Sequence, residues 1–163
     1  MLGFSTLGCP GLPLPAVAAL ARKYGISCVE LRCAPDEPVH VGISPGERAR
    51  VREDLAGLEI NSLASYYRLC DDPLDKLRAH VELAHDLGVP AIRVFPGKSP
   101  ETSVELAAER LARAAEVAEG VTLLVETHDL LLRGAEIARS LSATASSSVC
   151  PWSTAPARDQ SPG

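Results

Sequence analysis

The sequence predicts an α/β fold in which about five strand-helix units form one parallel sheet. Short apolar and β-branched runs alternate with longer segments of helical period, and the runs recur at a nearly constant interval. Successive runs start 26, 32, 31 and 31 residues apart, which leaves room for one strand, one helix and two short connections. The runs begin near Leu2, Cys28, Ile60, Ala91 and Thr122.

Helix start and stop signals lie between these runs. Pro13 and Pro15 suit the first turn of a helix, and Gly25 suits its left-handed C-terminal cap. The motif Ser44-Pro45-Gly46-Glu47 predicts a capping box. The later helices are expected from Ser44 to Leu55, from Asp72 to Gly88, from Thr102 to Glu119 and from Gly134 to Leu141.

Length and composition predict one globular domain and a tail. The chain has 163 residues, of which 46% are hydrophobic and 23% charged. Residues 1–141 contain the periodic pattern and are expected to form the domain. Residues 142–163 hold six serines and three prolines without strand or helix period. We expect that tail to be disordered, because it offers little apolar surface to bury.

Charge and cysteine content narrow the function classes and the compartment. The net charge of −5, with three lysines among sixteen basic residues, disfavours a nucleic-acid partner. No apolar run has the length of a membrane span, and the N-terminus lacks the features of a signal peptide. The five cysteines have no CxxC spacing and are expected to be reduced and structural. We therefore expect a cytoplasmic protein.

Strand alternation places five polar side chains on one face of the sheet. Val29, Leu31, Ile92, Val94, Leu123 and Val125 suit the layer that packs against the helices. The opposite face, toward the carboxyl ends of the strands, then receives Glu30, Arg32, Arg93, Glu126 and His128. Barrels and open α/β sheets have their sites at this end.

Each of these residues has a structural interpretation beside a functional one. Glu30 either forms a buried ion pair with Arg32 or Arg93, or contacts a substrate, and the same choice applies to Arg93. A functional role is favoured for Glu126, because a glutamate is rarely buried at a strand end unless it is paired or coordinated. His128 suits a supporting polar role, metal binding or loop capping.

Two tyrosines and three histidines also have structural and functional interpretations. Tyr66 and Tyr67 suit either a pocket lining or the core. His40, His80 and His85 have no partner at ligand spacing and are expected in solvent.

Several segments resemble the strands of the xylose-isomerase-like TIM barrels, the sugar phosphate isomerase/epimerase family. The similarity covers about residues 1–141. The segments are Gly3-Phe4-Ser5-Thr6, Gly25-Ile26-Ser27-Cys28-Val29-Glu30-Leu31-Arg32, Leu87-Gly88-Val89-Pro90-Ala91-Ile92-Arg93-Val94 and Leu124-Val125-Glu126-Thr127-His128-Asp129.

The resemblance implies a partial (β/α)8 TIM barrel whose C-terminal three units are missing, since a full barrel needs about 250 residues. It also implies a divalent metal, Mn, Co, Mg or Zn, and a small sugar or sugar phosphate as substrate. By the resemblance, Glu126 is a metal ligand and an acid/base group. Glu30, Arg93, His128 and Tyr66 are the expected substrate-binding residues.

Three functions are compatible with the sequence. The first is a metal-dependent sugar isomerase or epimerase, which we expect to be inactive or weakly active as a single chain. The second is a non-catalytic association module, because the unpaired edges of strands one and five would favour homo-oligomers. The third, a nuclease acting at abasic sites, is disfavoured by the acidic charge.

Overall fold

The computed structural model describes residues 2–100, 102–128, 133, 135, 138 and 149–152. Six parallel strands form one sheet in sequence order. They are β1 (Gly3–Ser5), β2 (Cys28–Arg32), β3 (Glu59–Arg68), β4 (Ala91–Phe95), β5 (Thr122–Glu126) and β6 (Val149–Trp152). The helices are the 3-10 turn η1 (Thr6–Gly8) and the α-helices α1 (Leu14–Tyr24), α2 (Pro45–Asp54), α3 (Leu74–Leu87) and α4 (Val104–Val117).

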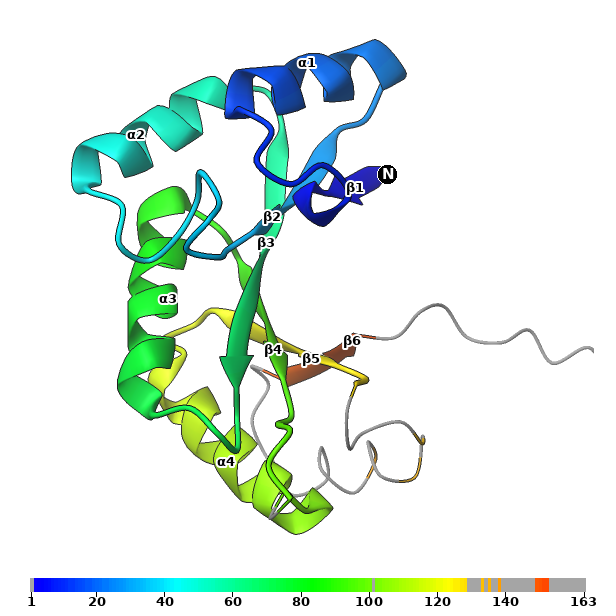
Figure 1. Ribbon diagram of the computed structural model, residues 1–163, viewed down its shortest axis with the longest axis vertical. Coiled ribbons are helices and arrows are strands. Elements are labelled where there is room, and N and C mark those ends of the chain that lie inside the picture. Colours follow the sequence, from blue (N-terminus) through cyan, green and yellow to red (C-terminus); the bar gives the residue numbers. More distant parts are fainter. Residues whose placement is uncertain are drawn as a thin grey trace, which may run out of the picture.

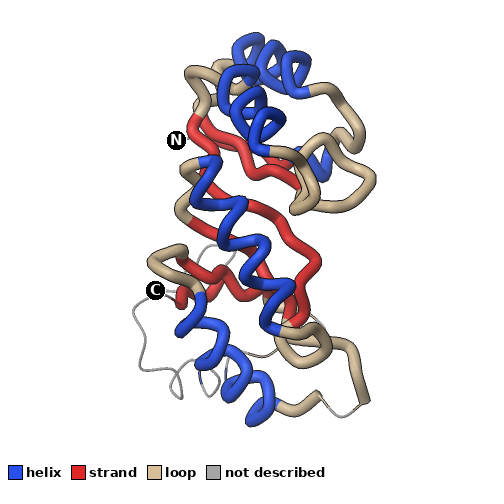
Figure 2. The backbone as a smooth tube through the Cα atoms, turned by 90° about the vertical axis from the view of Figure 1, so that its left-hand side faces the viewer, coloured by secondary structure: helices blue, strands red, loops and turns tan. Residues whose placement is uncertain are grey.

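All four α-helices cover the same face of the sheet. Figure 1 shows them along one side of the strands, and Figure 2 shows them in front of the sheet. Sequential parallel strands with helices on one face are typical of a TIM barrel, whereas a doubly wound sheet has helices on both faces. The predicted partial TIM barrel is therefore confirmed.

The helix boundaries follow from the local signals in the sequence. The Ser44 hydroxyl accepts a hydrogen bond from the Glu47 N–H at 3.3 Å, and Glu47 Oε2 accepts one from the Ser44 N–H at 2.7 Å. The predicted capping box is thus present. Gly25 and Gly88 end α1 and α3 with φ of 65° and 69°, in the left-handed region that glycine adopts without strain.

The core lies between the sheet and the helices. The strand residues predicted to face the helices are all buried in one cluster with the apolar sides of α1, α3 and α4: Val29, Leu31, Ile92, Val94, Leu123 and Val125. This burial confirms the predicted alternation and leaves the other face of the strands to polar side chains.

The end of the chain differs from the prediction. We expected no strand in residues 142–163, but Val149–Trp152 forms β6 and pairs with β5. The exposed peptide groups at the edge of β5 offer hydrogen bonds to a passing extended segment even when its sequence has no strand period. Strand five is therefore not an open edge. The other residues of 142–163, and most of the helix predicted from Gly134 to Leu141, lie outside the described residues.

The position of His80 differs from the prediction. His80, expected in solvent, is 5% exposed on α3, and its Nδ1 lies 2.7 Å from the Lys76 carbonyl oxygen. That expectation was wrong, because the position of His80 on α3 directs its side chain toward the core.

Cys9, Cys28, Cys33 and Cys70 are free thiols. Burial raises the pKa of Cys33 to about 12, so this thiol stays protonated and unreactive. None of the helices in the described ranges is long and apolar enough to cross a membrane.

Candidate functional site

The strand register brings the predicted polar residues together at the carboxyl ends of the strands. Ala64 of β3 pairs with Arg32 of β2 on one side and Arg93 of β4 on the other. Glu30 pairs with Ser62 one level below. We call this end of the sheet, on the face away from the helices, the mouth.

Arg93 is the centre of a buried charge cluster. Its side chain is 9% exposed and lies between two carboxylates, Glu30 and Glu126, which are 12% and 27% exposed. Arg93 Nη1 contacts Glu126 Oε2, and Arg93 Nε lies 3.8 Å from Glu30 Oε2. The Ser62 hydroxyl donates to Glu30 Oε2 at 3.1 Å. The ion pair between Glu30 and Arg93 is thus present, whereas none forms between Glu30 and Arg32.

One atom of this cluster lacks a hydrogen bond. Arg93 Nε is buried without a hydrogen bond among the described residues, although it lies 3.8 Å from Glu30 Oε2. Buried polar atoms of this kind are uncommon in structural ion pairs and frequently mark a place where a ligand or water supplies the missing bond.

Phe95 connects the other predicted residues to Arg93. The guanidinium carbon of Arg93 lies 5.2 Å from the ring centroid of Phe95. Tyr66 stacks on Phe95 at 6.1 Å, and the His128 ring meets it edge-on at 5.5 Å. The structure therefore brings Glu30, Arg93, Glu126 and His128 together, as the strand alternation predicts, and adds Tyr66 to the same group.

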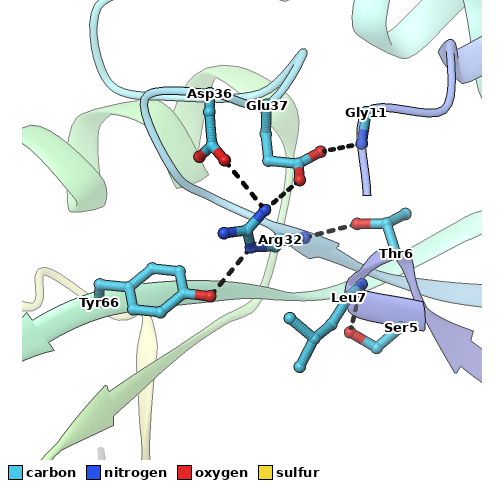
Figure 3. A network of polar contacts seen from close by, with 8 residues as sticks. All are labelled: Ser5, Thr6, Leu7, Gly11, Arg32, Asp36, Glu37 and Tyr66. Carbon is cyan, nitrogen blue, oxygen red and sulfur yellow. Dashed lines mark hydrogen bonds and ion pairs between the residues drawn. The ribbon is translucent and has the colours of Figure 1, made fainter. Parts of the chain in front are cut away.

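A second network surrounds Arg32 and spans three loops and strands (Figure 3). The Arg32 Nε donates to Tyr66 Oη at 2.9 Å, and its Nη1 contacts Glu37. The N–H of Gly11 donates to the second Glu37 oxygen at 3.1 Å, and the backbone N–H of Arg32 donates to Thr6 Oγ1 at 2.7 Å. The bonds to Tyr66 and Glu37 raise the pKa of Arg32, which therefore stays charged.

The Arg32 network orients the Tyr66 hydroxyl. Because Arg32 donates to the phenol oxygen, the phenol proton remains available for a different acceptor. Tyr66 is accordingly a mouth residue, and its neighbour Tyr67 is a core residue at 1% exposed. The sequence left open whether these two tyrosines line a pocket or pack in the core. Adjacent residues of a strand point to opposite faces, so Tyr67 packs in the core and Tyr66 lies on the mouth face.

Two mouth residues, Phe95 and Arg68, are not among the site residues predicted from the sequence. Strand alternation places Phe95 on the polar face, but this residue has no charge to single it out. Arg32, which alternation also places on this face, bonds to Tyr66 and Glu37 rather than to Glu30. Arg68 ends β3 two residues after Tyr66, and its guanidinium carbon lies 5.5 Å from the Phe95 centroid. The alternation that found Arg93 could have found Arg68.

The described residues do not fit a divalent-metal centre. A zinc site of the usual kind has three or four convergent donor side chains. Within the described ranges, no group of three His, Cys, Asp or Glu residues could hold a metal. Glu126, the expected ligand, contacts a cation instead.

A hollow lies at the opposite end of the sheet. It has a volume of about 440 Å³ and is bordered by Arg52, Glu59, Ile60, Gly88 and Pro90, at the amino ends of β3 and β4. Ligands of parallel α/β folds bind at the carboxyl ends of the strands, so we assign the site to the mouth.

Comparison with protein families decides the family of this fold. The model of the xylose isomerase-like TIM barrel family matches residues 18–149. This chain belongs to that family. Comparison with curated protein sequences found no significant match.

Solved structures of xylose isomerase-like barrels resemble the chain at low identity. A xylose isomerase domain-containing protein from Salmonella typhimurium is 20% identical, with a TM-score of 0.62 over 76% of this chain and 48% of its own. A D-allulose 3-epimerase from Methylomonas sp. is 15% identical, with a TM-score of 0.68 over 91% of this chain and 60% of its own.

The IolI protein with a bound zinc atom is 15% identical, with a TM-score of 0.73 over 90% of this chain and 60% of its own. At these identities the likeness shows the fold alone. The chain spans about half to three fifths of the length of these three proteins.

Proposed function

We propose that the mouth binds a small sugar and that Glu126 moves a proton on the carbon next to the sugar carbonyl. The observation that supports this most directly is the partial exposure of Glu126: the residue ends β5, its side chain is 27% exposed, and one of its carboxylate oxygens contacts Arg93. A substrate can reach such a carboxylate, and its position is fixed by Arg93.

The proposed step is an enolisation. Glu126 takes the proton of a hydroxyl-bearing carbon beside the carbonyl. The electron pair of the broken C–H bond forms a carbon–carbon double bond, and the π pair of the carbonyl moves onto its oxygen, which takes up a proton. Return of the proton from Glu126 to the former carbonyl carbon, with loss of the neighbouring hydroxyl proton to solvent, gives an isomer. Protonation of the original carbon on its opposite face by a water molecule, with return of the carbonyl, gives an epimer. The Tyr66 proton, which Arg32 leaves available, is suited to the developing negative oxygen.

The other mouth residues would bind and orient the sugar. Glu30 has a carboxylate that can accept hydroxyl protons, and Arg93 has a buried Nε without a hydrogen bond. His128 lies against Phe95 at the end of β5, where it can contact the same ligand. The solved relatives include an enzyme named a D-allulose 3-epimerase and its complex with D-allulose, which supports a ketose as the first substrate class to test.

Only weak activity is proposed for the chain alone. The zinc-bound IolI structure suggests that the family uses divalent metals. The described residues hold no group of three metal donors, so the proposed proton transfer depends on the mouth residues alone.

Deuterium exchange tests the proposed proton transfer. The protein is incubated in D₂O with a panel of ketoses and ketose phosphates, and NMR follows loss of the proton next to the carbonyl. Glu126→Gln should lower the exchange rate by about a hundredfold, since general acid/base groups contribute on that order. The matched control is Glu116→Gln, an exposed carboxylate on α4. Equal rates in the two variants, or no exchange above buffer for the natural chain, would contradict the proposal.

Association through β1 is the second candidate function. β1 is a three-residue edge strand, and Leu2 and Leu7 beside it are 64% and 48% exposed. Unpaired strand edges with apolar neighbours favour pairing between chains. Light scattering over a range of protein concentrations tests this function, and a monomer at every concentration would argue against it.

A further inference from the structure

Arg68 is a cation of the mouth that has no ion-pair partner in the described part of the chain. It is the last residue of β3, beside the ends of β2 and β4. The mouth contains two other arginines: Arg32 pairs with Glu37 and Asp36, and Arg93 pairs with Glu30 and Glu126. Among the residues that the structure describes, Arg68 forms no ion pair, and its Nε is buried without a hydrogen bond.

The acidic residues nearest in sequence are engaged elsewhere. Asp71 accepts hydrogen bonds from the backbone N–H groups of Lys98 and Ser99, at 2.8 and 3.3 Å. Asp72 accepts from the backbone N–H of Arg68 at 2.7 Å and pairs with Lys76 at 2.8 Å. The guanidinium carbon of Arg68 lies 5.5 Å from the ring centroid of Phe95. Stacking on an aromatic ring fixes the plane of a guanidinium and leaves its N–H edge open.

Arg68 also lies near Arg93, which contacts Glu126, the proposed proton-transfer residue. Arg68 and Arg93 both lie over Phe95, with guanidinium carbons 5.5 and 5.2 Å from its centroid. They are thus no farther apart than the sum of these two distances, and Arg93 contacts Glu126. A small sugar whose reacting carbon lies at Glu126 could extend a terminal group to Arg68.

We propose that Arg68 binds a terminal anionic group, a phosphate or a carboxylate, on the substrate of the mouth. This inference rests on the proposed function, because it assigns the substrate class of the same site. A planar guanidinium with free N–H groups matches the oxygens of either anion in a two-point contact. The isolated positive charge would thus select an acidic sugar derivative over its neutral parent.

Equilibrium binding to matched ligands tests the assignment. NMR titrations compare D-fructose with D-fructose 6-phosphate, and D-gluconate and inorganic phosphate serve as carboxylate and free-anion probes. We expect the phosphate ester to bind about tenfold more tightly than the neutral sugar, as one charge-assisted contact provides. Arg68→Gln should remove this preference and leave the affinity for D-fructose within about twofold.

Two further variants control the experiment. Arg113→Gln, which removes an exposed arginine of α4, should keep the preference. Arg68→Lys keeps the charge without the two-point geometry and should retain part of it. Equal affinity of the natural chain for the two fructose ligands overturns the inference, as does an Arg68→Gln variant that weakens both ligands equally. If Arg68→Gln does not fold, the natural chain and Arg68→Lys decide the result by the same comparison.

The outcome is independent of proton transfer. Binding that prefers anions without deuterium exchange would support the Arg68 assignment and contradict the proposed function. Exchange on neutral ketoses by a natural chain that shows no preference for the phosphate ester over D-fructose would do the reverse. A difference between the phosphate and carboxylate arms would show which anion the mouth selects.

Discussion

The two arginine networks of the mouth differ in how completely their polar atoms are bonded. Around Arg32, both oxygens of Glu37 have a partner, and the phenol oxygen of Tyr66 accepts a hydrogen bond (Figure 3). Around Arg93, the guanidinium Nε is buried without a hydrogen bond among the described residues. The networks lie in neighbouring strands of the same sheet, so burial alone does not explain the difference.

This difference separates a supporting role from a binding role. The Arg32 network connects η1, the loop at Gly11 and the loop at Glu37, and it positions Tyr66. A network with this many connected hydrogen bonds makes local structure rigid. The Arg93 cluster retains a buried donor, Arg93 Nε, that a ligand can use.

Removing the centre of the less complete network should have the largest effect on stability. Arg93→Met leaves Glu30 and Glu126 as neighbouring carboxylates without their cation. Breaking a buried ion pair from one side costs about 3 kcal/mol of unfolding free energy. Urea denaturation measures this loss. Arg113→Met, which breaks an exposed pair with Glu109, should change stability by less than about 0.5 kcal/mol. Similar small losses in both variants would mean that the Arg93 cluster is not a connected unit.

A substitution in the Arg32 network, Glu37→Gln, should lower stability less than Arg93→Met does. Glu37→Gln keeps an oxygen for the Gly11 N–H but removes the negative charge that faces Arg32. We expect a loss of about 1 to 2 kcal/mol, because a buried charge-assisted contact is replaced by a neutral one. The Tyr66 hydroxyl should then be less well oriented, so ligand affinity should fall as well. Unchanged affinity, measured by NMR titration beside urea denaturation, would separate the network from the binding role of Tyr66.

The smallest effect concerns His80, a buried residue of α3 that belongs to neither network and makes stability depend on pH. Burial lowers the pKa of His80 below the 6.5 of an unfolded chain. The unfolded state therefore binds more protons as the pH falls, so the contribution of neutral His80 to stability is full above about pH 6.5 and is lost below it. His80→Gln should reduce the acid-dependent part of the unfolding free energy, whereas His85→Gln, on the exposed side of α3, should not. Identical pH profiles in the two variants would contradict the assignment to His80.

Much of the mouth could be predicted from the sequence because the strand period fixes which side chains share a face. Glu30, Arg93 and Glu126 were assigned to one face by alternation alone, and the structure places them in one cluster. Their pairing could not be predicted. Whether Glu30 meets Arg32 or Arg93 depends on the register between β2, β3 and β4, including the irregularity between Val29 and Glu30.

The sequence by itself determined the fold class, the helix ends and the polar face of the sheet, because these depend on period and on local capping chemistry. The tertiary structure decided what depends on contacts between distant residues. In the structure, Val149–Trp152 pairs with β5, and His80 is buried in the core. The side chains of Tyr66, Arg68, Arg93 and His128 lie around the ring of Phe95. The tertiary structure also left Arg68 without an acidic partner in the described part of the chain, since ion pairing requires side chains to meet in space and no spacing along the sequence fixes that meeting.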